Sequence, residues 1–310
     1  ADDDDVLHCG AVAQGFVGSG ARLVEALEAG ALEVLASAGD RPDLFPSFDE
    51  RPQQKEMVCA VTEALNSGQR LLIEAGTGTG KSLAYLIPSA CHALANGRRV
   101  VVSTATINLQ EQLTKKDIPA LQALMPGSGL RACQLKGRRN YLCLRQFEAL
   151  RGQPALNDAE ALIASRILIW LCQTETGDRA ELRLSQAEEA VWSRISADTT
   201  ECNSDTSPYV VDSTCFLHRA RKQAEGSHIV VVNHALLLSD TATGGRVLPP
   251  YQHLVIDEAH HLEDEATRRF GFTTSEKLLS EMIDRCESIP RSVESGLRGS
   301  AAGGGPYDEL

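Results

Sequence analysis

The architecture of this chain is set by LLIEAGTGTGKSLAYLI, residues 71–87. The apolar run at its start, residues 71–73, predicts a short buried strand, and the apolar run at its end predicts a helix. Glycines between the two runs let backbone N–H groups turn toward phosphate oxygens, while the helix N-terminus adds unpaired donors and a positive dipole. A strand, a glycine-rich turn, Gly-Lys-Ser and a helix, in this order, indicate a phosphate-binding P-loop.

The predicted P-loop gives its residues definite roles. Lys81 would reach the β- and γ-phosphates of ATP, and the Ser82 hydroxyl would ligate Mg²⁺. Ala75 stands where the usual pattern has glycine, and a small residue fits there. The alternative is a glycine-rich turn that binds nothing, which the context of Gly-Lys-Ser disfavours. The predicted nucleotide-binding residues of the loop are Ala75, Gly76, Thr77, Gly78, Thr79, Gly80, Lys81 and Ser82.

A second motif, LVIDEAH at residues 254–260, ends an apolar strand with two carboxylates. Asp257 would lie beside the phosphates and hold Mg²⁺, and Glu258 would orient and deprotonate the attacking water. A solvated helix start is the alternative, and the P-loop upstream disfavours it. The sequence therefore predicts Lys81, Asp257 and Glu258 as catalytic residues, with ATP and Mg²⁺ as cofactors.

The composition is typical of a globular protein in a reducing compartment. The chain has 310 residues, of which 43% are hydrophobic, enough for two domains or one large domain with insertions. No run approaches the roughly 18 to 20 apolar residues of a membrane span, and the acidic N-terminus is unlike a secretory leader. Nine cysteines without a paired framework favour a cytoplasmic location. Because the chain begins with Ala1 rather than Met, we interpret it as a fragment or a processed product.

The charge distribution is compatible with a nucleic-acid partner, although the formal net charge is −12. Residues 1–50 hold eleven acidic and two basic side chains, so residues 51–310 carry only −3. Between residues 130 and 150, five cations accompany one carboxylate, with two aromatic residues among them. Bases could stack on such aromatics while the cations hold phosphates, and a solvated basic face is the alternative. The candidates for DNA contact here are Arg138, Arg139 and Tyr141.

Strand and helix patterns alternate from Glu50 onward. Continuous apolar strands interleaved with helices imply a parallel sheet covered by helices on both faces. Between residues 137 and 227 the strand patterns disappear, which indicates a helical insertion. We predict further strands at residues 100–103, 130–135, 228–232 and 254–257, and helices at residues 22–38, 53–66, 107–114, 161–172, 185–195 and 216–225.

Taken in order, the motifs resemble those of DEAH-type superfamily 2 helicases. RPQQ at residues 51–54 is similar to the adenine-reading glutamine motif, with Gln54 as the best candidate. STATINLQEQ at residues 103–112 resembles motif Ia, which contacts single-stranded DNA. KGRRNYLC at residues 136–143 and IVVVNHAL at residues 229–236 are similar to the segments that flank the iron–sulfur insertion of the DinG/XPD-like DNA helicases.

The resemblance implies an α/β fold. This fold is a RecA-like P-loop parallel sheet with helices on both faces, interrupted by a helical iron–sulfur-type insertion and followed by the start of a helical arch. The implied domains are an incomplete helicase domain 1 at residues 49–136 and 228–260, the insertion at residues 137–227, and the arch at residues 261–290. We interpret residues 1–48 as a leader and linker, or as the tail of a missing domain, and residues 291–310 as a flexible end.

The function implied is that of an ATP-dependent DNA helicase with 5′-to-3′ polarity, which moves along single-stranded DNA in repair- or replication-associated work. The chain would lack helicase domain 2 and its arginine fingers, so we expect nucleotide binding and little or no unwinding from it alone. Two other functions stay open. One is a P-loop ATPase that acts on a non-nucleic substrate, and the other is a non-catalytic fragment that binds DNA or a protein partner.

The resemblance also implies roles for residues near the nucleotide site. Ser103, Thr104 and Thr106 would contact DNA, because they follow a strand at the edge where ligands collect in open α/β sheets. The alternative is a polar turn in which Thr104 or Thr106 caps a helix. His260 would couple the nucleotide site to the DNA site through hydrogen bonds.

The four cluster-binding cysteines of the family are only partly matched. Cys143, Cys202 and Cys215 stand at three of the expected positions, and Ser207 stands at the remaining one. A [4Fe–4S] cluster is normally held by four thiolates, and a serine alkoxide is a poor iron ligand at neutral pH. Three interpretations stay open: a complete cluster in which Ser207 or another group fills in, a labile or degraded cluster, and no cluster.

Overall fold

The computed structural model describes residues 20–46, 48–49, 51–76, 78–198, 207–271 and 280, with the backbone alone for residues 20–26. The chain divides into two compact units, residues 1–265 and residues 266–310. The sheet and the helices packed on it belong to the first unit. No helix in the described ranges is both long and apolar enough to cross a membrane.

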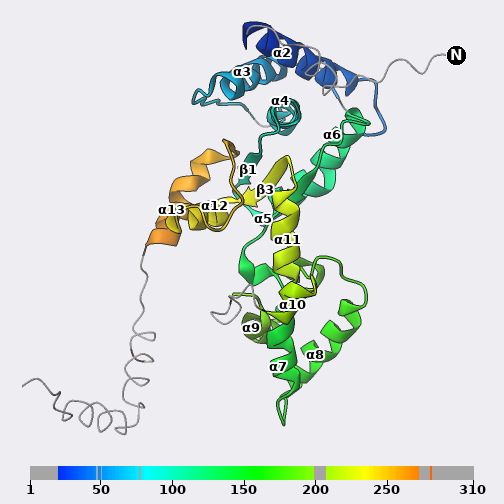
Figure 1. Cartoon of the computed structure of the whole chain (residues 1–310), viewed down its shortest axis with the longest axis vertical. Coiled ribbons are helices and arrows are strands. Elements are labelled where there is room, and N and C mark those ends of the chain that lie inside the picture. The colour runs from blue at the N-terminus through cyan, green and yellow to red at the C-terminus, as the bar shows by residue number, and fades with distance from the viewer. Residues whose placement is uncertain are drawn as a thin grey trace, which may run out of the picture. The chain divides into compact units, whose positions relative to one another are not determined.

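Four parallel strands form the sheet (Figure 1). They are β1 (Val100–Thr104), β2 (Ala132–Gln134), β3 (Ile229–Asn233) and β4 (His253–Ile256), which confirms four of the predicted strands. The strands lie in the order β2–β3–β1–β4, and Val101 is opposite Val230 on one side and Leu254 on the other. Valine and isoleucine dominate β1 and β3, and their branched side chains favour extended backbone.

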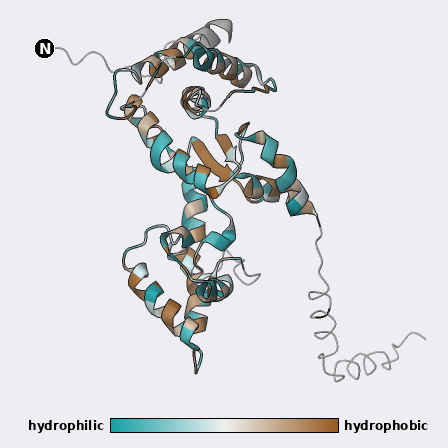
Figure 2. Cartoon of the chain, turned by 180° about the vertical axis from the view of Figure 1, so that it is seen from behind, coloured by the Kyte–Doolittle hydropathy of each residue, from teal (hydrophilic) through white to brown (hydrophobic). Residues whose placement is uncertain are grey.

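Helices pack on both faces of the sheet because successive side chains of a strand point in opposite directions. Val101 points into a core shared with α11 (Phe216–Glu225) and α12 (His234–Ala242). Val100 and Val102 point into another core, shared with α2 (Gly20–Ser37), α3 (Pro52–Ser67), α4 (Lys81–Asn96) and α6 (Ile118–Leu124). The strands accordingly carry the hydrophobic colour in Figure 2. This arrangement confirms the predicted RecA-like α/β fold.

Part of the predicted leader contributes to the core on the α2 side. Leu27, Ala31 and Leu35 of α2 are buried in it together with residues of α3 and α4. Phe45 and Phe48, in the predicted linker, pack partly buried against the same core. Burial of this apolar face stabilises α2, which its propensity alone would leave marginal.

The strand predicted at residues 71–73 is wrong. These residues lie outside any strand, and Leu71, Leu72 and Ile73 are 46%, 92% and 36% exposed. A strand forms only where a neighbour pairs with its backbone groups. In the described ranges β4 is the edge strand on that side of β1, and its Leu254 is 39% exposed. The apolar run therefore leads into the P-loop as an exposed segment.

The helical insertion has a core of its own. Its helices are α7 (Leu144–Arg151), α8 (Asp158–Leu171), α9 (Gln186–Ile195), α10 (Pro208–Val211) and α11, which confirms the helices predicted in this region. Capping boxes start α8 and α9 and satisfy the first backbone donors of each helix. Trp170 of α8 meets Trp192 of α9 edge to face, with ring centroids 6.3 Å apart.

One expected helix is shorter than predicted. The helix predicted at residues 107–114 ends earlier, as α5 (Ile107–Gln112), and a π-helical segment, Leu113–Asp117, leads into α6. After β4, a 3₁₀ turn at Ala259–His261 precedes α13 (Leu262–Phe270). The remainder of the predicted arch lies outside the described ranges, apart from residues 271 and 280.

Candidate nucleotide-binding site

The P-loop turns through left-handed glycines at the start of α4. Gly78 and Gly80 both have a φ of +78°, which residues with a Cβ rarely adopt. A Cβ at Gly80 would lie 2.1 Å from the side-chain nitrogen of Gln54, so that side chain would have to shift. The same nitrogen donates a hydrogen bond to the Gly80 carbonyl at 3.1 Å. Gln54, predicted to read adenine, thus lies against the P-loop, whereas Thr77 lies outside the described ranges.

Lys81, the first residue of α4, joins the two sequence motifs. Its Nζ lies 3.4 Å from the Ala75 carbonyl oxygen and 3.2 Å from Oε1 of Glu258. The side chains of Lys81 and Glu258 are 28% and 30% exposed, so solvent reaches both. Thr79 closes the loop by donating a hydrogen bond to the Gly76 carbonyl at 3.0 Å. The structure therefore brings the P-loop and the Asp-Glu motif together.

Asp257 is positioned by β1 and α4. Its backbone N–H donates to the Ser103 carbonyl at 2.8 Å, and the Tyr85 hydroxyl donates to Asp257 Oδ2 at 3.2 Å. Burial raises the pKa of Asp257, while the Tyr85 hydrogen bond and the charge of Lys81 oppose that rise. A carboxylate fixed in this way, near a P-loop serine, offers the oxygen ligands that Mg²⁺ prefers.

Glu258 adopts a left-handed backbone conformation, with φ of +53° and ψ of +46°. Residues other than glycine occupy this region at a cost of roughly 1–3 kcal/mol, and such conformations gather at functional sites. The turn directs the chain out of β4 and into the 3₁₀ turn. His260 lies beside it, with Nδ1 3.5 Å from Glu258 Oε2, and its side chain is 65% exposed.

Sequence reasoning missed two residues of this site, Tyr85 and Asp117. Burial raises the pKa of Asp117, the Ser82 hydroxyl lowers it and Asp257 raises it, so these three side chains share one environment. Tyr85 follows Lys81 by four residues, and this one-turn spacing on a helix could have revealed it. No sequence signal marks Asp117, which the π-helical segment brings to the site.

The hydroxyls predicted to contact DNA after β1 are engaged within the protein. Ser103 and Thr104 are fully buried, and Ser103 Oγ lies 2.7 Å from Nδ1 of His234. Thr104 donates to the Thr106 carbonyl at 3.1 Å. Thr106 caps α5, because its hydroxyl accepts a hydrogen bond from the Leu109 N–H at 3.2 Å. Thr106 is thus a helix cap, as the alternative interpretation expects, and the DNA contacts stay a prediction.

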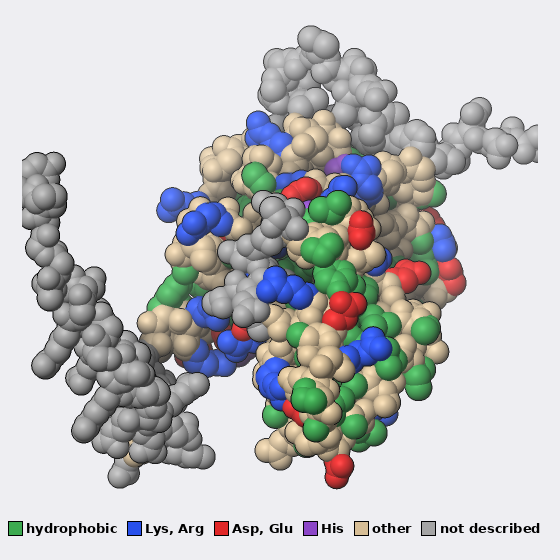
Figure 3. Space-filling view, turned by 60° about the horizontal axis from the view of Figure 1, so that its bottom comes forward, with side chains coloured by type: hydrophobic (Ala, Val, Ile, Leu, Met, Phe, Trp, Pro, Cys, Tyr) green, Lys and Arg blue, Asp and Glu red, His purple; other side chains and the backbone are tan. Residues whose placement is uncertain are grey.

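The aromatic side chains at the insertion entrance are buried. Tyr141 and Phe147 are 4% and 1% exposed, so neither offers a face on which a base could stack. Tyr141 is a core residue, contrary to its predicted role. Arg138 donates to a backbone carbonyl of the insertion at 2.9 Å, and Arg139, whose side chain is 80% exposed, pairs with Asp198. Basic side chains gather on the left half of the surface in Figure 3.

The candidate cluster ligands begin helices of the insertion. Cys143, Ser207 and Cys215 are the N-cap residues of α7, α10 and α11, and Cys202 lies outside the described ranges. Cys143 is buried and Cys215 half-buried in the insertion core. In the part of the chain that the structure describes, no three His, Cys, Asp or Glu side chains are grouped to hold a metal ion. With Cys202 the candidate donors are three thiols and one hydroxyl, whereas four thiolates normally hold a [4Fe–4S] cluster.

Comparisons with known proteins show which protein family the residues around this site match. Residues 51–156, which include Gln54 and the P-loop, match the DEAD/DEAH box helicase family. The ATP-dependent helicase DinG of Mycobacterium tuberculosis is 41% identical over 235 residues, which cover 70% of this chain and 35% of that protein. The ATP-dependent DNA helicase YoaA of Escherichia coli is 35% identical over 272 residues, which cover 85% of this chain and 41% of that protein.

A third relative carries a different name. The 3′-5′ exonuclease DinG of Bacillus subtilis is 36% identical over 248 residues, which cover 80% of this chain and 26% of that protein. This chain therefore carries a DEAD/DEAH box helicase domain, and DinG and YoaA proteins are its homologues. It spans between 26% and 41% of the length of these three relatives.

Proposed function

We propose that this chain contributes the ATP site of an ATP-dependent DNA helicase that moves 5′-to-3′ along single-stranded DNA. The observation that carries the proposal is the 3.2 Å contact between Lys81 Nζ and Glu258 Oε1, which unites the P-loop with the Asp-Glu motif. P-loop enzymes need both, a lysine on the phosphates and a residue that positions the attacking water. The name of the ATP-dependent DNA helicase YoaA supports DNA as the partner. A role in DNA repair and a cytoplasmic location belong to the same proposal.

The residues of the site divide the work of hydrolysis. Ser82 and Asp257 would hold Mg²⁺, which neutralises phosphate charge when it is bound. Lys81 would exchange its ion pair with Glu258 for phosphate oxygens, and because partly exposed pairs contribute only about 0–1 kcal/mol, a triphosphate can displace this one. The freed Glu258 carboxylate would then orient the attacking water and accept its proton.

ATP hydrolysis by the full-length protein, measured with and without single-stranded DNA, tests the proposal. The wild type should be stimulated by DNA, and Glu258→Gln should bind ATP yet hydrolyse it at least about a hundredfold more slowly. Hydrolysis that is indifferent to DNA would contradict the proposal and favour a P-loop ATPase with a non-nucleic substrate. Binding of DNA without any hydrolysis would favour the non-catalytic alternative.

The iron–sulfur cluster is a separate proposal with a separate test. We infer that a cluster held by Cys143, Cys202 and Cys215 would need Ser207 or another group as its fourth ligand. Iron content and visible absorbance of anaerobically purified protein measure its occupancy. Ser207→Cys should raise both if the three cysteines bind iron. A colourless, iron-free preparation of the wild type and of this variant would remove the cluster from the account.

A further inference from the structure

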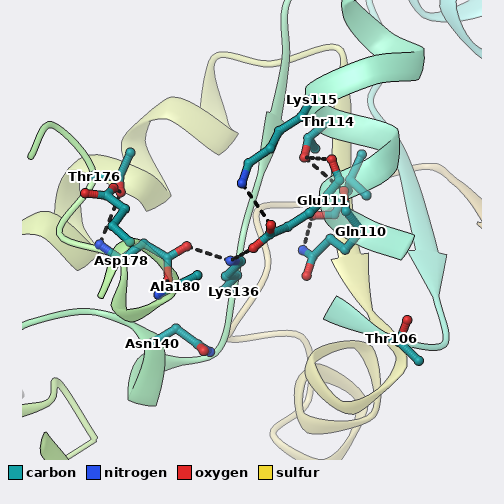
Figure 4. A network of polar contacts seen from close by, with 12 residues as sticks. Thr106, Gln110, Glu111, Thr114, Lys115, Lys136, Asn140, Thr176, Asp178 and Ala180 are labelled. Carbon is teal, nitrogen blue, oxygen red and sulfur yellow. Dashed lines mark hydrogen bonds and ion pairs between the residues drawn. The ribbon is translucent and has the colours of Figure 1, made fainter. Parts of the chain in front are cut away.

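Lys136 is a buried cation at the point where the sheet passes into the insertion (Figure 4). It follows β2 by two residues, and its side chain is only 3% exposed. Its Nζ forms two ion pairs, 2.9 Å to Oε1 of Glu111 and 2.6 Å to Oδ2 of Asp178. Glu111 belongs to α5 and Asp178 to the insertion, so one ammonium group joins three parts of the chain.

Hydrogen bonds hold each part of this junction in place. The backbone N–H of Lys136 donates to the Tyr141 hydroxyl at 3.1 Å, which anchors the first residues of the insertion. Gln110 of α5 is fully buried and donates to the carbonyls of Leu135 and Val231, both at 2.9 Å. These bonds fix α5 to β3 and to the segment that leads into Lys136.

The two carboxylates depend unequally on Lys136. Glu111 has a second partner, because Nζ of Lys115 lies 2.8 Å from its other oxygen. The side chain of Lys115 is 71% exposed. Asp178 is 14% exposed, so solvent would only partly replace the ammonium if it were removed. Desolvation offsets much of the attraction within a buried ion pair, but removal of one partner leaves the other charge buried and uncompensated.

The junction around Lys136 is linked through α5 and β1 to Asp257, which follows β4. α5 begins just after β1, whose Ser103 carbonyl accepts the N–H of Asp257. We propose that Lys136 is a positioning residue that sets the insertion against α5, so that DNA bound by the insertion stimulates ATP hydrolysis at the P-loop. This inference rests on the proposed helicase function and gives Lys136 no contact with DNA or nucleotide.

Full-length protein with Lys136→Met tests the inference, because methionine fills similar space without the charge. Lys115→Met is the matched control, since it removes the exposed cation from the same carboxylate, Glu111. The measurements are ATP hydrolysis without DNA, the maximal stimulation by single-stranded DNA, and the dissociation constant for that DNA. In Lys136→Met the maximal stimulation by DNA should fall about tenfold, while the rate of hydrolysis without DNA should stay within about twofold of the wild-type rate. Lys115→Met should leave all three quantities unchanged.

Asp178→Asn supplies an independent measurement, because it removes the negative charge of the insertion's carboxylate and keeps the shape of the side chain. It should reduce the stimulation in the same selective way, in assays run well below the melting temperature of each variant. Equal loss of basal and stimulated hydrolysis in both Lys136→Met and Asp178→Asn would show a purely structural role and overturn the inference. Full stimulation in both would overturn it as well. A wild type without any DNA stimulation would refute the proposed function, and this inference with it.

Discussion

Lowering the pH from about 7.5 to about 5 should remove about 2 kcal/mol of folding free energy through a single side chain, His92. His92 lies in α4, is 5% exposed, and has Asn66 Oδ1 3.0 Å from its Nδ1 and His253 Nε2 3.0 Å from its Nε2. Asn96 Nδ2 lies 3.3 Å from the same Nδ1, so both ring nitrogens of His92 already face polar neighbours. Protonation would place a positive charge among these buried groups and next to His253.

The magnitude follows from the pKa of His92 in the folded chain. Burial, followed by the charges of His253 and Arg98, lowers this pKa from 6.5 to about 4. A histidine whose pKa is lowered by folding contributes stability that is complete above pH 6.5 and is lost as the pH falls toward the folded value. At about pH 5 the unfolded state binds nearly one proton more than the folded state at this site, and the difference integrates to about 2 kcal/mol.

Urea unfolding of the wild type and of His92→Gln at both pH values measures this contribution. Subtracting the pH dependence of the variant removes the effect of every other titrating group. The wild type should lose about 2 kcal/mol more than His92→Gln. Identical losses in the wild type and His92→Gln would refute the lowered pKa of His92 and the burial of this side chain between α4 and β4.

Four further variants test other parts of the structure. Lys81→Ala should abolish ATP binding in an equilibrium titration, and unchanged affinity would contradict the P-loop assignment. Leu72→Ser should change the free energy of unfolding by less than about 0.5 kcal/mol, because Leu72 is 92% exposed, while a loss of about 2 kcal/mol would mean a buried strand. Gly177→Ala should destabilise the chain by about 2 kcal/mol or more, because its φ is +65° and a Cβ would lie 2.2 Å from the Phe216 ring. Gly129→Ala, with φ of +68° and open space around it, should cost only about 1 kcal/mol, and equal melting temperatures for the two variants would argue against the Phe216 contact.

The sequence predicted strands well where each strand has a partner. The strands Val100–Thr104 and Ile229–Asn233 each begin with a continuous apolar run and pair with each other, and both were expected. The run at residues 71–73 shows the same pattern and forms no strand. The difference lies in pairing, which is a property of two segments, whereas a hydrophobic pattern describes only one.

The contact between the P-loop and the Asp-Glu motif was predictable because topology brings strand ends together. Lys81 and Glu258 are far apart in sequence, but the carboxyl ends of parallel strands share one edge of the sheet, where the P-loop also lies. The role of Tyr141 was not predictable in the same way, since an aromatic residue among cations has the same pattern whether it packs in a core or faces solvent. The partners of Lys136 also carry no local signal, because Glu111 and Asp178 belong to different elements.

The carboxyl ends of β1 and β4 are tied to the start of α12, which limits how the site can respond to a nucleotide. Ser103 accepts the Asp257 N–H through its carbonyl and contacts His234 through its hydroxyl, and burial lowers the pKa of His234, which favours the neutral ring. Moving Asp257 would break buried hydrogen bonds, each of which costs roughly 1–3 kcal/mol to leave unmade. The Lys81 side chain is 28% exposed and held by a pair that contributes far less. We therefore expect a triphosphate to be accommodated by rotation of Lys81 away from Glu258, while the strand ends stay in place.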